Sequence, residues 1–548
     1  MAHSSTASDK DPLYLEAHDD DDERRNLCGT FWKRLGFVGV AVVIGVVSVL
    51  GLSIGLGLGL GLRHRDHVKF TTPAIVTVPL QSSPPSNFVL NGLKGQPPQT
   101  RVYAFNVSNA LGAPDGVVRP MLVVNGMFPG PTIEANQGDR IIINVTNNMD
   151  VPTSIHWHGL FQNQTNFYDG TSGITECGIP PGQFLVYKFG RFLTFTFGEF
   201  SGTTWWHAPH ESYRCAHTFT DYSTQYADGI TGALIVHPSE PSPPDFPTWD
   251  QDLVVQMNDW YHTFSSQLSA AYLSPFGIDG TAGDEPVPES GTLNGLGQYG
   301  QGGNYFNFTL EPNKTYRLRL INSGSFASIR FSIDNHPLTV IEAEGTLVKP
   351  YTVSGVTIAV AQRYSVLIHT NQTVQQDGTF WMRANIQTDM FTYVVWGQNT
   401  DVRGILRYST APNLAAVPVA ADDPGPGMSW VGDMDTSLLV PAVVDSPPER
   451  TRMYLVVVAL ENTADGRFLA FMNRTSWEPL SGTTSLLLVR EAGLERHNAT
   501  SFAPVGGSLQ DGDQFYVTED SIQVVDLLIN NLDDGDHPFH LHGFRPWV

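Results

Sequence analysis

The stretch His156-Trp157-His158-Gly159 places two histidines two residues apart, directly after a strand-like run at residues 141–145. Side chains on an extended backbone alternate between the two faces of a sheet. His156 and His158 are therefore expected on one face, where their imidazoles can bind one metal ion or two neighbouring ions. Taken alone, the pattern is more often an ordinary strand than a metal site.

Two further histidine groups change that balance. The cluster His537-Pro538-Phe539-His540-Leu541-His542-Gly543 lies near the other end of the chain, and a third group begins at His207. Imidazole is a common ligand of both copper and zinc. Zinc hydrolases usually add a carboxylate, as in His-Glu-x-x-His, and none of the three groups has that form. Histidines gathered without the carboxylate of such a motif favour copper.

Length and composition predict an all-β protein of several domains. The chain has 548 residues, 41% of them apolar, with 52 glycines and 37 prolines. Short β-branched and aromatic runs, such as 316–321, 364–369 and 454–459, recur between Gly, Asn and Asp turns. This spacing is typical of β-sandwiches and unlike an alternation of strands and helices. The net charge of −23 argues against nucleic acid as a partner.

Changes in composition divide the chain into six parts. A polar acidic segment is followed by an uncharged apolar run, and proline-rich stretches near 238–247 and 411–427 separate the strand-rich blocks. The predicted parts are a cytoplasmic acidic tail (1–34), a transmembrane signal-anchor (35–62), a stalk (63–100) and three β-sandwich domains (101–238, 248–410 and 430–548).

The run 35–62 is long enough to cross a bilayer as a helix. A cleaved signal peptide is the alternative, but the run is too long and starts too far from the N-terminus. A high density of Asn-x-Ser/Thr sequons beyond it predicts a single-pass membrane glycoprotein whose body is extracellular or lumenal. The sequons lie at Asn106, Asn144, Asn163, Asn307, Asn313, Asn371, Asn473 and Asn498.

The chain contains three cysteines, Cys28, Cys177 and Cys215, which are too few for a disulfide scaffold. At most one bridge can form beyond the membrane run, between Cys177 and Cys215. The sequence does not establish that these two residues meet.

Short motifs rich in glycine, tryptophan and histidine run through residues 101–548. They are Val124-Asn125-Gly126, Phe128-Pro129-Gly130-Pro131-Thr132-Ile133, Gly138-Asp139, His156-Trp157-His158-Gly159, Asp169-Gly170, Glu176-Cys177-Gly178-Ile179-Pro180-Pro181-Gly182, Gly202-Thr203-Thr204-Trp205-Trp206-His207, Tyr226-Ala227-Asp228-Gly229, Asp259-Trp260-Tyr261-His262, residues 316–322 and residues 537–543. In these motifs the sequence resembles the multicopper oxidases, the family of laccases, fungal iron oxidases and ascorbate oxidase.

The resemblance implies three cupredoxin domains of Greek-key topology with a trinuclear copper cluster between the first and third. A type 1 copper in the third domain would take single electrons from a substrate, and the cluster would reduce dioxygen to water. The implied ligands are His537 for type 1 copper, His156 and His540 for type 2, and His158, His207 and His542 for type 3.

Two departures from the family pattern qualify this expectation. After His207 a second histidine should follow one residue later, but Ala208-Pro209-His210 stands there. His210 and His217 are both candidates for that type 3 ligand, and His210 is favoured because it is closer, although Pro209 disrupts strand pairing. In addition, no cysteine follows Cys215, whereas blue copper needs a thiolate. The third domain is thus expected to be incomplete and the chain, as written, inactive.

The sequence leaves two alternatives for the reducing substrate. The family implies O2 with either phenols and aromatic amines or Fe(II) as reductant, and an iron permease would be the partner of an iron oxidase. Asp259 occupies a position where iron oxidases carry an acid, so it is a candidate substrate-side acid; a structural turn acid is the competing interpretation. The other function class is a non-enzymatic copper-binding scaffold at the cell surface, which the missing ligands favour.

Overall fold

The computed structural model describes residues 77–547, apart from 91, 190–199, 210–224, 279, 373–377, 414, 419–433, 465, 478, 481, 492–513, 515–516, 518, 520, 534 and 536. The predicted acidic tail and transmembrane segment lie outside these residues, as do His210, His217, Cys28 and Cys215. Within the described part of the chain, no helix has both the length and the apolar character that crossing a bilayer requires.

The first sandwich, formed by β1–β11, shows why alternating residues become strands. In β7 (Arg140–Asn147), Ile141, Ile143 and Val145 are fully buried, while the residues between them face outward. These side chains pack against Ile133, Leu234 and Val236 of the opposite sheet. One sheet has the order β2-β5-β4-β3-β7-β9, with β1 beside β3, and the other has the order β6-β11-β10-β8.

Among the described residues, the first sandwich has eleven strands, β7 among them, and two 3-10 turns. Besides β7, they are β1 (Thr77–Pro79), β2 (Gln81–Ser82), the 3-10 turn η2 (Pro85–Asn87), β3 (Thr100–Gly112), β4 (Arg119–Val124), β5 (Met127–Phe128), β6 (Ile133–Asn136), β8 (His156–Trp157), η3 (Asn166–Tyr168), β9 (Phe184–Phe189), β10 (Gly202–His207) and β11 (Thr231–His237).

The second sandwich, β12–β24, packs a sheet of order β13-β12-β17-β22-β19-β20 against one of order β16-β24-β23-β18-β21. Its elements are β12 (Gln251–Trp260), α2 (Ser265–Tyr272), β13 (Ser290–Leu293), β14 (Gln298–Tyr299), β15 (Gly302–Gly303), β16 (Phe306–Leu310), β17 (Thr315–Asn322), β18 (Ile329–Ile333), β19 (Leu338–Ala343), β20 (Thr346–Val353), β21 (Val356–Ile358), β22 (Arg363–His369), β23 (Thr379–Ile386) and β24 (Asp401–Tyr408).

The third sheet has the order β26-β25-β27 and follows the turn η4 (Thr436–Leu438). Its parallel pair joins β25 (Arg452–Asn462) to β27 (Val525–Asn531), and the helix α3 (Ser485–Glu491) lies between β26 (Phe468–Met472) and β27 in the sequence. Every residue of β27 is exposed, including its leucines and isoleucine. The described residues of this region therefore bury far less apolar surface than either sandwich.

The predicted stalk, residues 63–100, is wrong where the structure describes it. β1 pairs in parallel with β3, and Phe88 and Leu90 are buried in the core of the second sandwich. Leu90 donates its backbone N–H to Asp252 O at 3.1 Å, and Val254 donates to Phe88 O at 2.8 Å. The apolar run Phe88-Val89-Leu90 explains this docking, because burying it removes apolar surface from water.

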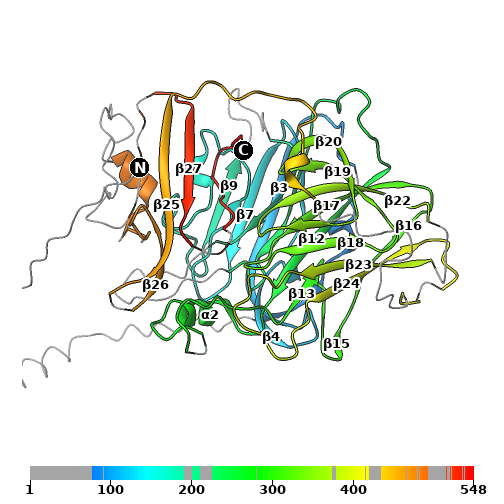
Figure 1. Ribbon diagram of the computed structural model, residues 1–548, viewed down its shortest axis with the longest axis horizontal. Coiled ribbons are helices and arrows are strands. Elements are labelled where there is room, and N and C mark those ends of the chain that lie inside the picture. The colour runs from blue at the N-terminus through cyan, green and yellow to red at the C-terminus, as the bar shows by residue number, and fades with distance from the viewer. Residues whose placement is uncertain are drawn as a thin grey trace, which may run out of the picture. The chain divides into compact units, whose positions relative to one another are not determined.

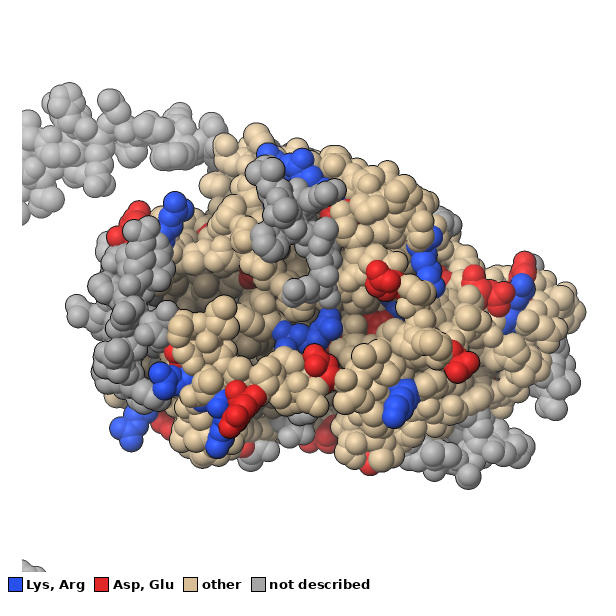
Figure 2. All heavy atoms as spheres, turned by 90° about the horizontal axis from the view of Figure 1, so that it is seen from above, with Lys and Arg blue, Asp and Glu red and all other residues tan. Residues whose placement is uncertain are grey.

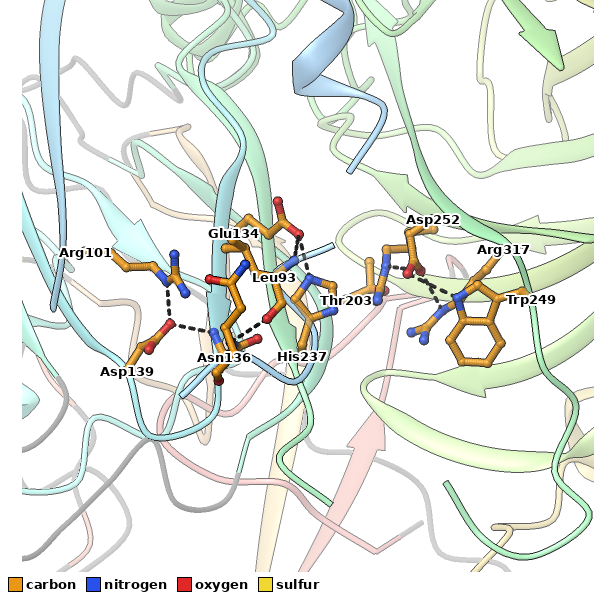
Figure 3. A network of polar contacts seen from close by, with 12 residues as sticks. Leu93, Arg101, Glu134, Asn136, Asp139, Thr203, His237, Trp249, Asp252 and Arg317 are labelled. Atoms are coloured by element: carbon orange, nitrogen blue, oxygen red, sulfur yellow. Dashed lines mark hydrogen bonds and ion pairs between the residues drawn. The ribbon is translucent and has the colours of Figure 1, made fainter. Parts of the chain in front are cut away.

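A cluster of buried charged side chains in the second sandwich makes hydrogen bonds to Thr203 of β10 in the first sandwich. Glu342 is 1% exposed, pairs with Arg317, and accepts a hydrogen bond from the Thr203 N–H at 2.7 Å. Arg319 donates to Thr203 Oγ1 at 2.9 Å. Figure 3 shows this region, with Asp252 beside Arg317 and Thr203 on one side of the view and the pairs of the first sandwich on the other. The contact orients β10, which carries His207.

Acid is expected to lower the stability of the folded chain by protonating Asp252, which pairs with Arg317 and Arg319 in this charged cluster. Burial opposes ionisation of the Asp252 carboxyl, but Arg319 and Arg317 outweigh it and lower the pKa to about 2. The unfolded value is about 3.9, so the folded state is favoured by about 2–3 kcal/mol above about pH 5, and this is lost progressively as the pH falls through about 2. Urea unfolding between those pH values measures it. Asp252→Asn should flatten the dependence, and an unchanged slope in that variant would contradict the assignment.

Candidate metal centre

Two short strands of the first sandwich bring three histidines to one face. β8 pairs antiparallel with β10, with His156 directly opposite His207 and Trp157 opposite Trp206. Opposed residues in an antiparallel pair point to the same side of the sheet. The two tryptophans turn into the sandwich core, where both are fully buried, and the histidines turn away from it. His158, two residues after His156, has its ring centroid 5.9 Å from that of His207.

The C-terminal segment adds two more imidazoles to this face. The ring of His540 stacks on the ring of His158 with centroids 3.8 Å apart and an interplanar angle of 13°. The ring of His542 lies 4.1 Å from that of His156. In Figure 1 this segment, drawn in red after β27, returns to the cyan strands of the first sandwich. Residues almost 400 positions apart in the chain thus meet at one place.

The five histidines form two groups that could each hold a metal ion. His156, His158 and His207 make one group, and His156, His540 and His542 make the other. Within each group the ligand nitrogens lie within 4.8 Å of one another. Because His156 belongs to both groups, two ions bound here would be neighbours. The structure therefore brings together five of the histidines that the sequence proposed as ligands.

Unpaired buried nitrogens show that the residues present fit a metal. His156 Nε2 and His207 Nδ1 are buried and have no hydrogen-bond partner. Leaving such a group unsatisfied costs about 1–3 kcal/mol. The other ring nitrogen of His156, Nδ1, lies 2.8 Å from the carbonyl oxygen of Asp169. Donation from Nδ1 to that oxygen fixes the tautomer and directs Nε2 to a metal, as is usual for histidine ligands. The donor set suits copper.

Burial keeps these imidazoles in the neutral form that binds metals. Burial lowers the pKa of His158 and of His207, and neighbouring positive groups and imidazoles add to the effect. For His540, burial together with the neighbouring His542 and His156 lowers the pKa to about 3. At neutral pH no proton therefore competes with a metal at these three residues.

Asp169 is the functional residue that sequence reasoning did not select. It is 4% exposed, and its Oδ2 accepts hydrogen bonds from His542 Nδ1 at 2.7 Å and Thr171 Oγ1 at 2.9 Å. Burial opposes its ionisation, but the hydrogen bonds from His156 and His542 hold the pKa of its carboxyl well below the usual range. The feature of the sequence that could have identified Asp169 is the glycine that follows it, Gly170. Gly170 has φ of +82°, and a Cβ there would lie 1.7 Å from Ile155 O, so only glycine allows this approach.

His537 lies apart from the other five. Its Nε2 is 2.8 Å from Asp533 Oδ2, and none of the described residues completes a group of three metal ligands around it. Its predicted role as type 1 ligand stays a prediction. The choice between His210 and His217 falls outside the described residues.

Asp259, the candidate substrate-side acid, is buried. It is 2% exposed, and its carboxylate accepts three backbone N–H bonds, from Ser325, Phe326 and Ala327, at 2.8–2.9 Å. A carboxylate so occupied holds the loop after β17 in place. The geometry favours the alternative interpretation of a structural acid.

Comparisons with known proteins agree with this geometry. Two family models described as multicopper oxidase match residues 106–241 and 251–411. Laccase-1 of Cryptococcus neoformans var. neoformans is 33% identical over 466 residues, which cover 81% of this chain and 69% of that relative. The chain belongs to the multicopper oxidase family. It is therefore a copper-dependent oxidoreductase, and its cofactor is copper.

Further relatives of this multicopper oxidase include iron-transport proteins. The iron transport multicopper oxidase FET3 of Kluyveromyces lactis is 29% identical, with 81% of this chain and 64% of that protein covered. The crystal structure of Fet3p, described as a multicopper oxidase that functions in iron import, superposes with a TM-score of 0.65 at 27% identity. That match covers 81% of this chain and 75% of the Fet3p chain. The two sandwiches thus have the cupredoxin-like fold of the family.

Proposed function

We propose that this multicopper oxidase receives electrons from a reductant beside His537 and reduces dioxygen at the five-histidine centre. The observation that carries the proposal is the pair of histidine groups sharing His156, with unpaired nitrogens on His156 and His207. Copper held there supplies the one-electron redox chemistry that imidazoles lack. The type 1, 2 and 3 assignments inferred from the family resemblance are part of this proposal.

The protein's own groups would position and shield the centre. Trp205 stacks on His207 with ring centroids 4.1 Å apart, which fixes the plane of that ring. The Asp169 carbonyl orients His156, and the Asp169 carboxylate orients His542. Because His156 and His158 are 1% and 4% exposed, their ring nitrogens are protected from bulk water. Rigid partners of this kind preserve ligand geometry during electron transfer.

For the reductant, the surroundings of His537 favour Fe(II). Asp533 contacts the imidazole directly. Burial raises the pKa of the nearby Glu285 carboxyl, Asp533 and Asp284 add to the rise, and His537 opposes it. Asp533 therefore touches the imidazole, and the Glu285 carboxyl is close enough to interact electrostatically with both residues. Carboxylate oxygens of this kind bind hard divalent cations. These carboxyl groups, and not the buried Asp259, are the residues that support iron as the reductant.

A phenolic or aromatic amine reductant is the second candidate, because an apolar loop also reaches this place. Met390 Cε would lie 3.8 Å from a Cβ on Gly535, and Phe391 stacks on Phe326. On the same loop Val394 and Trp396 are 88% and 94% exposed. Exposed aromatic and apolar side chains of this kind can bind planar apolar rings.

Fe(II) binding separates these candidates. We expect Asp533→Asn combined with Glu285→Gln to weaken anaerobic Fe(II) binding by about 10-fold or more, since two carboxylate ligands are lost at a cost of at least 1.4 kcal/mol. Isothermal titration of the full chain measures this. The exposed Asp245, between β11 and β12, supplies the matched control, Asp245→Asn, which should bind as the parent does. Equal affinities for all three proteins would favour the aromatic reductant.

The location is proposed as a single-pass membrane protein with a glycosylated extracellular or lumenal body and, for an iron oxidase, an iron permease as partner. Exposure of six sequon asparagines supports glycosylation, whereas Asn473 is 8% exposed and its side chain donates to Leu455 O. On the face shown in Figure 2, charged groups of both signs lie in small sets among uncharged surface. The six exposed residues are Asn106, Asn144, Asn163, Asn307, Asn313 and Asn371.

The residues 1–548 are expected to bind copper at the histidine centre without an intense thiolate-to-copper absorption band, because no cysteine follows Cys215. The alternative function is a non-enzymatic scaffold at the cell surface, which would bind copper but would not catalyse the reduction of dioxygen. The chain as written is expected to be inactive in turnover, so reoxidation of its chemically reduced copper by dioxygen decides between the two: reoxidation with oxygen consumption proportional to bound copper supports the oxidase, and copper that dioxygen does not reoxidise supports the scaffold.

A further inference from the structure

Glu176 is a carboxyl group that the copper ligands and their hydrogen bonds leave unexplained. It lies on the loop between η3 and β9, where its Oε1 accepts a hydrogen bond from the Tyr187 hydroxyl at 2.7 Å. Its other oxygen, Oε2, is buried and has no hydrogen-bond partner. Among the described residues, the groups that act on it electrostatically are Tyr187 and Asp169, and neither is a cation. A carboxylate that has one oxygen buried without a hydrogen-bond partner, and no cation beside it, is costly, and protonation lowers that cost.

A second unpaired oxygen lies on the neighbouring acid. Asp169 Oδ1 is buried without a partner, while Asp169 Oδ2 bonds His542. One carboxylate oxygen of Asp169 therefore binds a histidine of the centre, and the other is available to accept a proton. Burial raises the pKa of Glu176 to about 7, the Tyr187 hydrogen bond opposes the rise, and the negative charge of Asp169 adds to it. Two interacting carboxyl groups, each with one oxygen buried and without a hydrogen-bond partner, are expected to hold a proton on one of them.

The surrounding contacts keep this arrangement rigid. Tyr187 is fully buried, and its hydroxyl accepts the Ile155 N–H at 3.3 Å. The same loop is fastened from the third region, where the N–H groups of Ser485 and Leu486 donate to Gly173 O at 3.1 Å and Ile174 O at 2.9 Å. Glu176 thus lies on a loop that is attached by hydrogen bonds both to the first sandwich and to the start of α3.

We propose that Glu176 is the proton-holding residue of the histidine centre, giving its proton toward Asp169 while dioxygen is reduced and regaining one from solvent. The inference rests on the proposed function, because reducing dioxygen to two water molecules consumes four electrons and four protons. Each proton that leaves Glu176 forms a carboxylate that the Tyr187 hydroxyl continues to hold. The next proton from solvent restores the acid, so the residue is unchanged at the end of the cycle.

Infrared difference spectroscopy of the full chain tests the proton directly. We expect the carbonyl stretch of a neutral carboxylic acid that falls to half its intensity near pH 7. Glu176→Gln should abolish that band, and the matched control Glu240→Gln, at an exposed glutamate, should keep it. A parent spectrum without the band near neutral pH would overturn the proposal.

Two milder variants keep the test valid even where Glu176→Gln fails to fold. Tyr187→Phe removes the hydrogen bond that stabilises the carboxylate, so the half-intensity point should move to higher pH. Asp169→Asn removes a neighbouring negative charge, so the point should move to lower pH while the band itself remains. A band that Tyr187→Phe does not shift, or that Asp169→Asn abolishes, would assign the proton elsewhere and contradict the proposal.

Loading the chain with copper(II) tests whether the proton on Glu176 responds to metal bound at the histidine centre. Positive charge bound by the histidines should favour the Glu176 carboxylate, so loading copper at pH 7 should diminish the band and release a proton, which a pH indicator detects. Bound copper that leaves the band unchanged would overturn the proposal while the proposed function stood. Failure of copper to bind, with the band present in the metal-free chain, would instead overturn the proposed function and remove the basis of the inference.

Discussion

Replacing His156 by alanine is expected to lower the affinity of the chain for copper more than about 100-fold. Loss of a residue that only supports a metal ligand costs about 10–100-fold, and His156 is a shared member of both ligand groups. His207→Ala removes a ligand from one group only, so it should leave the other group able to bind. Competition with a copper chelator, followed by metal analysis of the purified protein, measures both losses.

His369→Ala is the matched control for these variants. His369 is exposed on β22, and its Nδ1 bonds Thr315 Oγ1 at 3.0 Å, away from the histidine centre. This variant should retain the copper content of the parent. If His156→Ala binds as much copper as His369→Ala does, the centre is not where the structure places it.

Replacing Glu342 by glutamine is expected to destabilise the folded chain by about 3–5 kcal/mol. Removing one partner of a buried ion pair leaves the other charge uncompensated, and that is the usual cost. Here Arg317 and Arg319 would both remain buried, at 4% and 1% exposure, and Asp252 alone would be left to pair with the two of them. The Thr203 N–H would keep an acceptor only if the new amide oxygen faced it. Denaturant unfolding, followed by circular dichroism, gives the change in the free energy of unfolding.

Glu311→Gln, at an exposed glutamate of the second sandwich, supplies the comparison and should change stability by less than about 0.5 kcal/mol. Because Glu342 accepts a hydrogen bond from Thr203 of β10, its replacement should also loosen β10. Copper retention by Glu342→Gln should therefore decrease before unfolding begins. A loss of stability no larger than that of Glu311→Gln would show that this charged cluster does not stabilise the folded chain.

Much of the centre follows from strand periodicity. The two-residue spacing of His156 and His158 and their position on one face come from side-chain alternation, which applies to any extended segment. The burial of Trp157 between them follows from the same rule, because the intervening side chain points into the core. The β-sandwich class likewise follows from short apolar runs between turns, and the strands β17 and β22 cover two of the runs that predicted it.

Other features depend on long-range contacts that periodicity does not contain. Phe88 and Leu90 fall in the predicted stalk, residues 63–100, yet their burial depends on a strand of the second sandwich. Asp169 is one acid among many in the sequence, and its importance arises only when a left-handed glycine allows its carbonyl to reach His156. For Asp259 the reverse holds, because three backbone N–H groups that occupy it come from a loop more than 60 residues later.

The most direct test of the account is copper K-edge X-ray absorption of the copper-loaded chain 1–548, compared with the chain carrying His540→Ala and His542→Ala. Neighbouring coppers bound by the five histidines should give a shell of nitrogen scatterers without sulfur, together with a copper–copper contribution. That contribution should disappear in the double variant, while the His156, His158 and His207 group keeps its copper. A copper–copper contribution that survives the loss of both C-terminal histidines, or a parent with single isolated coppers, would contradict the shared centre.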